Sequence, residues 1–391
     1  MESRARDLPH PCAARAFSAR LPGVIRAGGD GAAAARSKCR GWGQTGASPL
    51  HKGAPHVTRP LLLASLLGAV LAAPAIAQTA VPFTLDWRFE GPAAPYFLAI
   101  DNGHFAAEGL EVEISPGQGS LDAIPKVATG AFPIGFADMA SLIKFLDQNP
   151  DAPVTGVMMM YDVPAFAVVG RRSLGIETPA DLQGRRLGAP PPDGAWAQFP
   201  VFAAAQGLDV STITIEPVGF PTREPMLAAG EVDAVTGFSF TSSLSTERLG
   251  VPADDIVVML MADYGVELYG NVIIVNTDWA EANPALVTGF LRAVALGVRD
   301  AAADPAAGVA AIAERNPALD SELEVARLTM ALRDNILTPW VMENGLGNID
   351  AERFATSLEQ IAMGYTFTNP VEPSRYFTDA YLPTDGSLMM Q

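Results

Sequence analysis

The stretch Phe83–Leu110 reads FTLDWRFEGPAAPYFLAIDNGHFAAEGL, and it predicts a strand, a loop, a helix and a turn into a second strand. Apolar and polar residues alternate over 83–87, which is the period of a half-buried strand. A Gly-Pro pair then breaks the pattern. In the helix that follows, Pro95 can occupy the first turn, where a missing N–H costs nothing, and an Asn-Gly pair ends it.

The loop between this strand and helix carries candidate ligand contacts, which are Trp87, Phe89, Glu90 and Tyr96. A helix N-terminus offers free N–H donors, so a helix that opens toward an aromatic loop can present a ligand-binding corner. The alternative is that Trp87 and Phe89 are core residues at a strand end.

The same stretch carries a family resemblance. The strand that ends in Asp-Trp, the Pro-aromatic helix and the segment NGHFAAEGLEV (102–112) resemble the periplasmic solute-binding proteins for nitrate, sulfonates, taurine and thiamine pyrimidine precursors. The resemblance extends over about residues 81–370. It implies a type II periplasmic-binding-protein fold, with two lobes around a ligand cleft and a mostly parallel, helix-flanked sheet in each lobe. The alternation of strand and helix patterns independently predicts an α/β architecture.

Upstream of this region the sequence predicts a secretory signal peptide over 57–77. It has Arg59 in a positive segment, an apolar run from Leu61 to about Ala72, and an A-x-A cleavage site that ends at Ala77. The apolar run is too short to span a bilayer comfortably. Residues 1–56 show no apolar period, and we interpret them as a non-structural extension upstream of a true start at Val57, where a GTG codon would be read as Met. We therefore expect a periplasmic protein.

The composition of the part after the signal limits its chemistry. Residues 78–391 hold 16 Lys and Arg against 40 Asp and Glu, which gives a net charge of −24 and argues against nucleic acid as a partner. Both cysteines, Cys12 and Cys39, lie upstream, and His104 is the sole histidine that remains. Disulfides, a lipid-anchored cysteine and a Cys/His metal site are thus excluded. We expect a monomer without metal or cofactor.

Further candidate contacts follow two other strands of the first lobe. Gly119 and Ser120 lie in a glycine-rich turn before a helix, where backbone N–H groups can bind a polar or anionic group, although a simple loop is the alternative. Asp138 follows a buried strand, at a position that the resemblance places at the cleft edge. Asp138 can equally be the N-cap of the next helix.

The resemblance places the second lobe at 171–271 and the first lobe at 78–170 and 272–391. In the second lobe, the loop with Asp193 and Trp196 mirrors the Trp87 loop, and Phe238 and Arg223 are candidate wall residues, although Arg223 could instead pair with a surface acid. The return segment matches the family's ligand-contacting segment at Tyr264 and Tyr269.

These candidates favour a planar heteroaromatic or amine-bearing solute, similar to a thiamine pyrimidine precursor. Aromatic rings stack on planar ligands, and carboxylates accept hydrogen bonds from amino or ring N–H groups. An alkanesulfonate, taurine, nitrate or an aromatic acid remains an alternative, because helix-end N–H groups can bind an anion unaided.

The resemblance implies that the partners are an ABC permease and ATPase in the inner membrane. A periplasmic sensor subunit is a weaker alternative. The resembled family also includes fungal pyrimidine-forming enzymes, which rely on a histidine, a pyridoxal-phosphate lysine and a cysteine-rich run. Here the region after the signal has no cysteine and only Lys126 and Lys144, so we expect no enzymatic activity.

Overall fold

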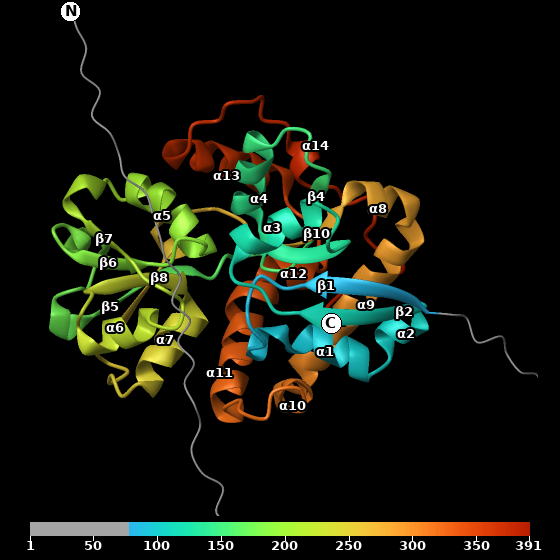
Figure 1. Cartoon of the computed structure of the whole chain (residues 1–391), viewed down its shortest axis with the longest axis horizontal. Helices are drawn as coiled ribbons and strands as arrows, with labels where there is room; N and C mark the ends of the chain where they lie inside the picture. The colour runs from blue at the N-terminus through green and yellow to red at the C-terminus, as the bar shows by residue number, and fades with distance from the viewer. Residues whose placement is uncertain (1–77) are drawn as a thin grey trace, which may run out of the picture. The chain divides into compact units, whose positions relative to one another are not determined.

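The computed structural model describes residues 78–391, which form two α/β lobes, each built on a five-stranded sheet (Figure 1). The predicted upstream extension (1–56) and signal peptide (57–77) lie outside the described residues. Within 78–391, no helix combines the length and the apolar character needed to cross a membrane. The two-lobed α/β fold predicted from the sequence is confirmed.

The first sheet has the strand order β2-β1-β3-β10-β4. β1 pairs in parallel with β2 and β3, whereas β10 pairs antiparallel with β3 and β4. Its strands are β1 (Thr79–Thr84), β2 (Leu110–Ser115), β3 (Ile134–Asp138), β4 (Val154–Met159) and β10 (Asn271–Asn276). All of its strands except β10 therefore run in one direction.

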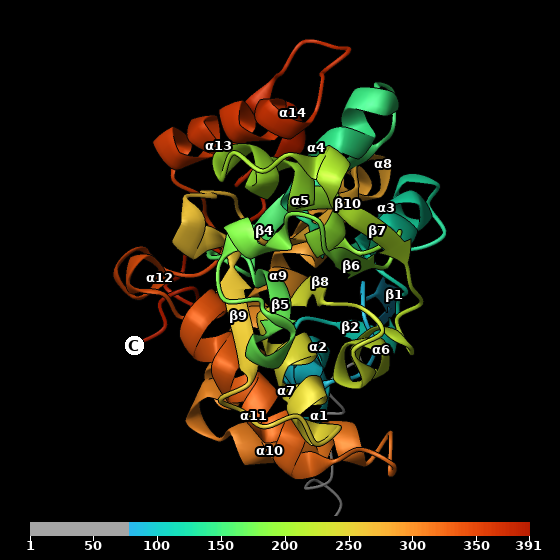
Figure 2. The same cartoon turned by 90° about the vertical axis from the view of Figure 1, so that its left-hand side faces the viewer.

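The second sheet repeats this arrangement in the order β7-β6-β8-β5-β9, with β5 as the reversed strand. Its strands are β5 (Phe166–Arg171), β6 (Arg186–Ala189), β7 (Thr214–Pro217), β8 (Ala234–Phe238) and β9 (Ile256–Leu260). Figure 2 shows α5 on one side of this sheet and α6 and α7 on the other. These helices are α5 (Gly194–Ala205), α6 (Arg223–Ala229) and α7 (Ser239–Arg248).

The reversed strands mark the two passages of the chain between the lobes. The chain crosses to the second lobe between Met159 and Phe166, and β10 is the first strand after it returns. The sequence-based boundary at 170/171 leaves most of β5 in the first lobe, but β5 pairs only with β8 and β9. A buried apolar strand does not reveal its partners in its sequence, which is why this boundary falls one strand late.

The first lobe holds the remaining helices. They are α1 (Ala94–Asp101), α2 (His104–Ala107), α3 (Ser120–Ala128), α4 (Met139–Gln148), α8 (Thr277–Ala282), α9 (Pro284–Ala303), α10 (Pro305–Ala313), α11 (Ser321–Ala331), α12 (Pro339–Asn344), α13 (Ala351–Gly364) and α14 (Pro373–Tyr376). The longest of these helices is α9, whose buried face includes Val287, Phe290 and Val294 at helical spacing.

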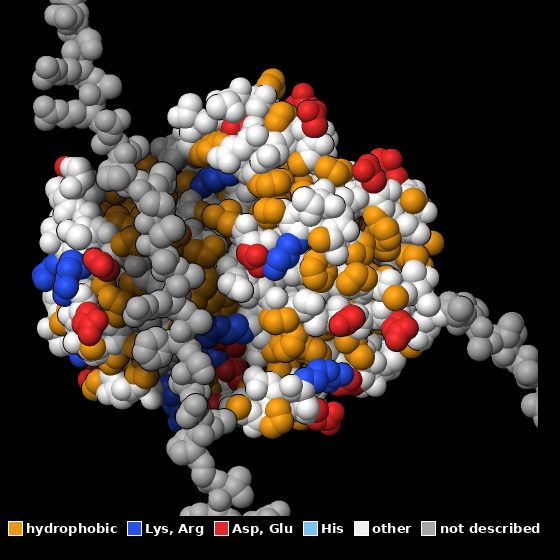
Figure 3. Space-filling model, in the orientation of Figure 1, with side chains coloured by type: hydrophobic (Ala, Val, Ile, Leu, Met, Phe, Trp, Pro, Cys, Tyr) orange, Lys and Arg blue, Asp and Glu red, His pale blue; other side chains and the backbone are white. Residues whose placement is uncertain are grey.

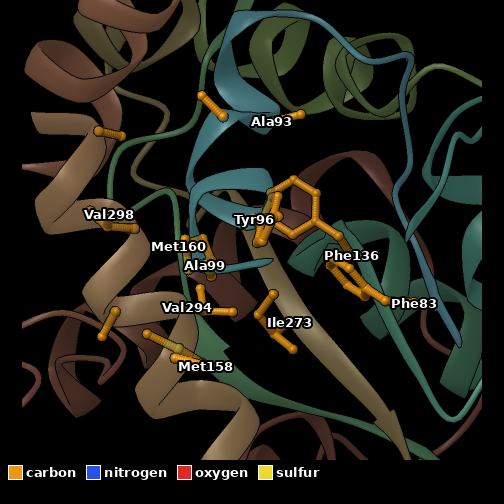
Figure 4. Packing of buried hydrophobic residues seen from close by; sticks show 14 of the residues in the cluster. Phe83, Ala93, Tyr96, Ala99, Phe136, Met158, Met160, Ile273, Val294 and Val298 are labelled. Carbon is orange, nitrogen blue, oxygen red and sulfur yellow. The ribbon is translucent and has the colours of Figure 1, made fainter. Parts of the chain in front are cut away.

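The core of the first lobe holds α1 against the sheet and against α9 (Figure 4). Tyr96 on α1 packs edge to face on Phe83 and on Phe136, with ring centroids 5.1 and 5.9 Å apart. On the other side of α1, Gly297 of α9 approaches so closely that a Cβ there would lie 2.0 Å from the carbonyl oxygen of Pro95. This packing fixes the direction in which α1 opens, and hence the position of the loop before it.

Candidate functional site

A cavity lies where the two lobes meet, and both lobes contribute to its walls. The space between its walls, together with the open solvent at its mouth, is about 620 Å³. Figure 3 shows the hollow between the lobes, in which basic and acidic side chains lie next to each other. The lining residues include Asp86, Trp87, Glu90, Tyr96, Gly119, Ser120, Phe136 and Tyr161 from the first lobe, and Asp193, Gly194, Arg223, Phe238, Phe240 and Thr241 from the second.

The floor of the cavity on the first-lobe side is formed by Asp86, two residues beyond the end of β1. Its Oδ2 accepts hydrogen bonds from Ser120 Oγ at 3.0 Å and from Asn271 Nδ2 at 2.6 Å. Burial raises the pKa of Asp86 to about 7, although these two hydrogen bonds act in the opposite direction. Near neutral pH this carboxyl is therefore close to the midpoint of its titration.

The glycine-rich turn before α3 folds back over the end of β1. The N–H groups of Gly117 and Gly119 donate to the carbonyl oxygens of Trp87 and Asp86, at 3.0 and 2.6 Å. A Cβ on Gly117 would lie 2.1 Å from the carbonyl oxygen of Leu85, and Gly119 has a φ of 103°. Glycine is required at both positions for this close approach, which brings Ser120 next to Asp86.

Aromatic rings make up most of the remaining wall. Phe136, Tyr161, Phe238 and Phe240 contact one another edge to face, with centroid separations of 5.5–6.4 Å. Trp87 crosses Phe220 of the second lobe at 4.4 Å, and no residue within 78–391 accepts a hydrogen bond from its indole N–H. Such a wall can hold a planar ring by stacking and offers it an N–H donor.

The wall on the second-lobe side contains a buried ionic cluster centred on Arg223, the first residue of α6. Arg223 is 2% exposed, and its guanidinium lies 2.7 Å from Glu224 and 3.6 Å from Asp193. Ser242 Oγ donates to Glu224 at 3.0 Å. Burial raises the pKa of Asp193, against the opposing effect of Arg223. Two carboxylates thus face this one guanidinium, so the cluster offers no net positive charge to a ligand.

A second ionic cluster links the lobes at the edge of the cavity. Arg327 on α11 lies 3.4 Å from Glu90 and also pairs with Glu324, and it donates to Ser245 Oγ on α7 at 2.5 Å. Thr241 on the same helix of the second lobe donates to Glu90 at 3.2 Å. Glu90, which lines the cavity, is therefore tied to the contact that holds α7 against α11.

The structure brings together many of the residues predicted as ligand contacts. The cavity lining includes Trp87, Glu90, Tyr96, Gly119, Ser120, Asp193 and Phe238. Arg223 is a wall residue, and it pairs with the buried acids Glu224 and Asp193 rather than with a surface acid.

Five predicted contacts are not part of this lining, namely Phe89, Asp138, Trp196, Tyr264 and Tyr269. The rings of Phe89, Trp196 and Tyr264 pack against Phe97, Phe199 and Phe202 instead, at 5.0, 5.6 and 5.9 Å. Tyr269 is buried beneath the guanidinium of Arg353, 4.1 Å from its ring centroid.

Asp138 takes the capping role that the sequence left open. Its Oδ1 accepts a hydrogen bond from the N–H of Ser141 at 3.0 Å, in the first turn of α4. It lies behind Ser120, whose Oγ accepts a hydrogen bond from the Asp138 N–H at 3.0 Å. Asp138 is therefore one layer removed from the cavity.

Sequence reasoning missed several lining residues, among them Asp86, Phe136, Tyr161, Phe240 and Thr241. Asp86 had a usable signal, because it immediately precedes Trp87 at the end of the first predicted strand. Phe136 and Tyr161 lie in or next to apolar strands, where the sequence does not distinguish a cavity wall from the core.

No cluster of potential metal ligands occurs among residues 78–391. The two lysines of this region are engaged outside the cavity lining. Lys126 pairs with Asp122 at 2.5 Å, and Lys144 donates to the carbonyl oxygen of Ala197 at 2.6 Å. His104 contacts Asp300 at 2.7 Å, also outside the lining.

Comparisons with known proteins find relatives that include binding proteins and enzymes. The chain is 25% identical to the riboflavin-binding protein RibY of Chloroflexus aurantiacus, over 84% of this chain and 93% of the relative. It is 28% identical to the formylaminopyrimidine-binding protein of Halalkalibacterium halodurans, over 56% of this chain and 64% of the relative. It is also 25% identical to the 4-amino-5-hydroxymethyl-2-methylpyrimidine phosphate synthase of Aspergillus parasiticus, over 61% of this chain and 71% of the relative.

Solved structures support the fold. The periplasmic aliphatic sulphonate-binding protein SsuA of Escherichia coli superposes with a TM-score of 0.60 at 15% identity, covering 77% of this chain and 98% of SsuA. The family model described as "NMT1/THI5 like" matches residues 92–308, which include α1, both crossings and the whole second sheet. With more than half of its length matched by this model, the chain belongs to the NMT1/THI5-like family.

Proposed function

We propose that this protein is the periplasmic solute-binding component of an ABC importer. Its two lobes would close on a small solute, and the closed form would deliver that solute to a membrane permease and its ATPase. The observation that carries the proposal is the cavity between the two lobes, whose walls combine aromatic rings from both lobes with buried carboxylates. Closure around a ligand is how two-lobed binding proteins of this architecture work.

The solute that best fits these walls is a planar nitrogen heterocycle. The lining carries Asp86, Glu90 and Asp193, while Arg223 is already paired with two carboxylates. Sulfonates and nitrate need cationic or N–H donors, for which this cavity has the exposed Arg88 and the Trp87 indole N–H. The three carboxylates of the lining outnumber these donors and disfavour an anion. Two relatives are named for riboflavin and formylaminopyrimidine, both nitrogen heterocycles, and this supports the same class of solute here.

Binding also fits the site better than the synthase chemistry of the fungal relatives. Lys126, Lys144 and His104 are each engaged with another residue outside the cavity lining. Covalent catalysis requires a nucleophile or base within reach of the substrate. The cavity instead presents side chains that stack, accept and donate, as expected of a binding site.

Thermal unfolding with a ligand panel tests the proposal. The panel contains 4-amino-5-hydroxymethyl-2-methylpyrimidine, formylaminopyrimidine, riboflavin, taurine, an alkanesulfonate and nitrate. A ligand at about one hundred times its dissociation constant should add roughly 2.7 kcal/mol of stability and raise the midpoint by several degrees. We expect a heterocycle to do so, and we expect Trp87→Ala to abolish the shift because it removes the largest ring at the cavity wall.

The matched control is Trp196→Ala, which removes a tryptophan that stacks on Phe199 outside the cavity. This variant should keep the ligand shift even if its own midpoint falls. A shift with sulfonate or nitrate alone would contradict the proposed solute class. An equal loss of the shift in both tryptophan variants would contradict the assignment of the cavity as the site.

Closure gives a second prediction, because the Arg327 cluster joins the lobes. Arg327→Ala should weaken solute binding by about tenfold or more, since the closed form would lose the contacts to Glu90 and Ser245 and become less populated. Small-angle scattering of the ligand-free variant should show a larger radius of gyration than that of the wild type.

The control is Arg248→Ala, which breaks another ion pair between the lobes, that with Asp320. Arg248 is 64% exposed, and exposed pairs contribute about 1 kcal/mol or less. Affinity and radius should therefore stay close to wild-type values. If the two variants behave alike, the buried cluster has no special part in closure.

A further inference from the structure

Asp86 is a buried carboxyl in the cavity wall, and no cation within 78–391 forms an ion pair with it. It is 5% exposed. The groups that face it are Ser120 on α3, Asn271 on β10, Asp138 at the end of β3, and the phenols of Tyr96 and Tyr161. Four of these five side chains are neutral, and the fifth is another acid.

We propose that Asp86 binds a positively charged N–H group of the solute. The solute would then be a heteroaromatic ring with an amidine-like edge, in which a protonated ring nitrogen lies beside an amino group. This inference rests on the proposed function and narrows it, because it assigns a charge to the solute and a partner to that charge.

The hydrogen-bonding pattern leaves one oxygen of Asp86 for a ligand. Ser120 and Asn271 both donate to Oδ2. No other residue within 78–391 donates a hydrogen bond to Oδ1, and Asp86 lines the cavity. Two fixed donors on one oxygen hold the carboxylate plane in place, so the other oxygen is positioned in advance for an N–H donor.

None of the nearby cations forms an ion pair with Asp86. Arg88 also lines the cavity, but it is exposed and its guanidinium lies over the Trp87 ring, 5.1 Å from the ring centroid. Arg223 is paired with Glu224 and Asp193 across the cavity. Lys144 donates to Ala197 and Gln198, and its charge acts on Asp138. A buried carboxylate without a counter-ion is unfavourable. A ligand cation that enters the cavity would supply the missing charge.

Two further buried acceptors lie beside Asp86. Asn271 Oδ1 and Asp138 Oδ2 have no hydrogen-bond partner within the described chain. Burial raises the pKa of Asp86 to about 7, as expected for a carboxyl that lacks a counter-ion. Asn271 and Asp138 lie behind the lining, so their oxygen atoms do not contact a ligand, but they add negative potential around Asp86 that favours a cation over an anion.

Benzamidine and benzamide provide a matched pair of probes. Both are planar and nearly equal in shape, but benzamidine is a cation at neutral pH and benzamide is neutral. Isothermal titration of the wild-type protein should show benzamidine binding at least about tenfold more tightly, as a charge-assisted hydrogen bond predicts. Asp86→Asn should remove this preference, because the amide would present N–H groups where Oδ1 now accepts.

Glu111→Gln serves as the control, since it removes the same charge from an exposed position on β2. Glu111→Gln should still bind benzamidine at least about tenfold more tightly than benzamide. If only Asp86→Asn loses this preference, the change in net charge is not the cause. The same variants are also titrated with 4-amino-5-hydroxymethyl-2-methylpyrimidine, a member of the ligand panel, so that the probes and the panel can be compared in one assay.

Equal binding of the two probes by the wild type would overturn the inference, as would an unchanged preference in Asp86→Asn. If neutral heterocycles bind while benzamidine does not, the proposed function survives and only the cationic assignment is wrong. If neither the probes nor any heterocycle binds, both the inference and the proposed solute class fail.

Discussion

Replacing Arg223 with alanine is expected to lower the free energy of unfolding by about 3–5 kcal/mol, the largest stability loss that we expect from a single substitution at the cavity. Arg223 is 2% exposed and lies against both Glu224 and Asp193. Its removal would leave two buried carboxylates without a cation. Chemical denaturation without ligand, followed by circular dichroism, measures the loss.

Two companion variants separate charge from packing. Arg172→Ala breaks an ion pair with Glu177 in the same lobe, 3.3 Å apart with both side chains more than half exposed, and should cost about 1 kcal/mol or less. Arg223→Met combined with Asp193→Asn and Glu224→Gln should recover part of the loss, because no buried charge is then left unpaired. If Arg223→Ala lowers the free energy of unfolding by no more than Arg172→Ala does, then the buried ion pairs of Arg223 do not stabilise the fold as expected.

The strand–loop–helix unit at the start of the described chain could be predicted because its signals are local. The alternation over 83–87, the Gly-Pro pair and the Asn-Gly pair each depend on neighbours along the chain. Trp87, Glu90 and Tyr96 lie in or directly after the loop of this unit, and they line the cavity. Where the position of a side chain follows from the local backbone, the sequence therefore predicted which residues line the cavity.

The sequence could not show which way side chains turn once tertiary packing decides. Tyr264 and Tyr269 come from the segment that returns to the first lobe, as the resemblance implied, but their rings pack on Phe202 and beneath Arg353. Phe136 shares a buried strand pattern with residues that never reach the cavity. This strand is buried on both faces, so its sequence does not alternate between apolar and polar residues. Such an alternation would have shown which face forms the cavity wall.

The sequence also could not show which strands pair with each other. β5 is mostly apolar and follows β4 after a short connection, so no local feature of the sequence assigns the two strands to different sheets. The ionic cluster between the lobes could not be predicted from the sequence either. Glu90 and Arg327 are far apart along the chain, and they meet only because α11 packs near the loop before α1.

The second large effect concerns pH. Asp86→Asn is expected to raise the free energy of unfolding of the ligand-free protein near pH 8 by up to about 4 kcal/mol, and to change it little near pH 4. The pKa of Asp86 rises from 3.8 to about 7 on folding because the carboxyl is buried. The folded state therefore holds this proton more tightly than the unfolded state. Ionisation destabilises the fold, with a penalty that begins above the unfolded pKa and is complete above about 7.

The comparison is made between variants because Asp86 does not titrate alone. Burial also raises the pKa of Asp138 to about 6, and the two carboxyls repel each other when both are ionised. Ser120 and Asn271 stay neutral, and burial raises the pKa values of Tyr96 and Tyr161, so neither phenol ionises in this range. The difference between wild type and Asp86→Asn, measured by denaturation from about pH 4 to pH 8, thus isolates the contribution of Asp86 together with its repulsion of Asp138.

Asp181→Asn provides a control of opposite sign. Hydrogen bonds from Thr178 and Glu177 lower the pKa of Asp181, so its ionised form stabilises the fold above the unfolded pKa, and this stability is lost as the pH falls. The variant should be less stable than wild type at neutral pH, and the deficit should shrink in acid.

For Asp86→Asn, the gain in the free energy of unfolding over the wild type should instead grow as the pH rises. Saturating benzamidine should reduce this gain, because it stabilises the wild type alone. A gain that does not change with pH would mean that Asp86 ionises without cost, in which case the cavity has no missing charge for a ligand to supply.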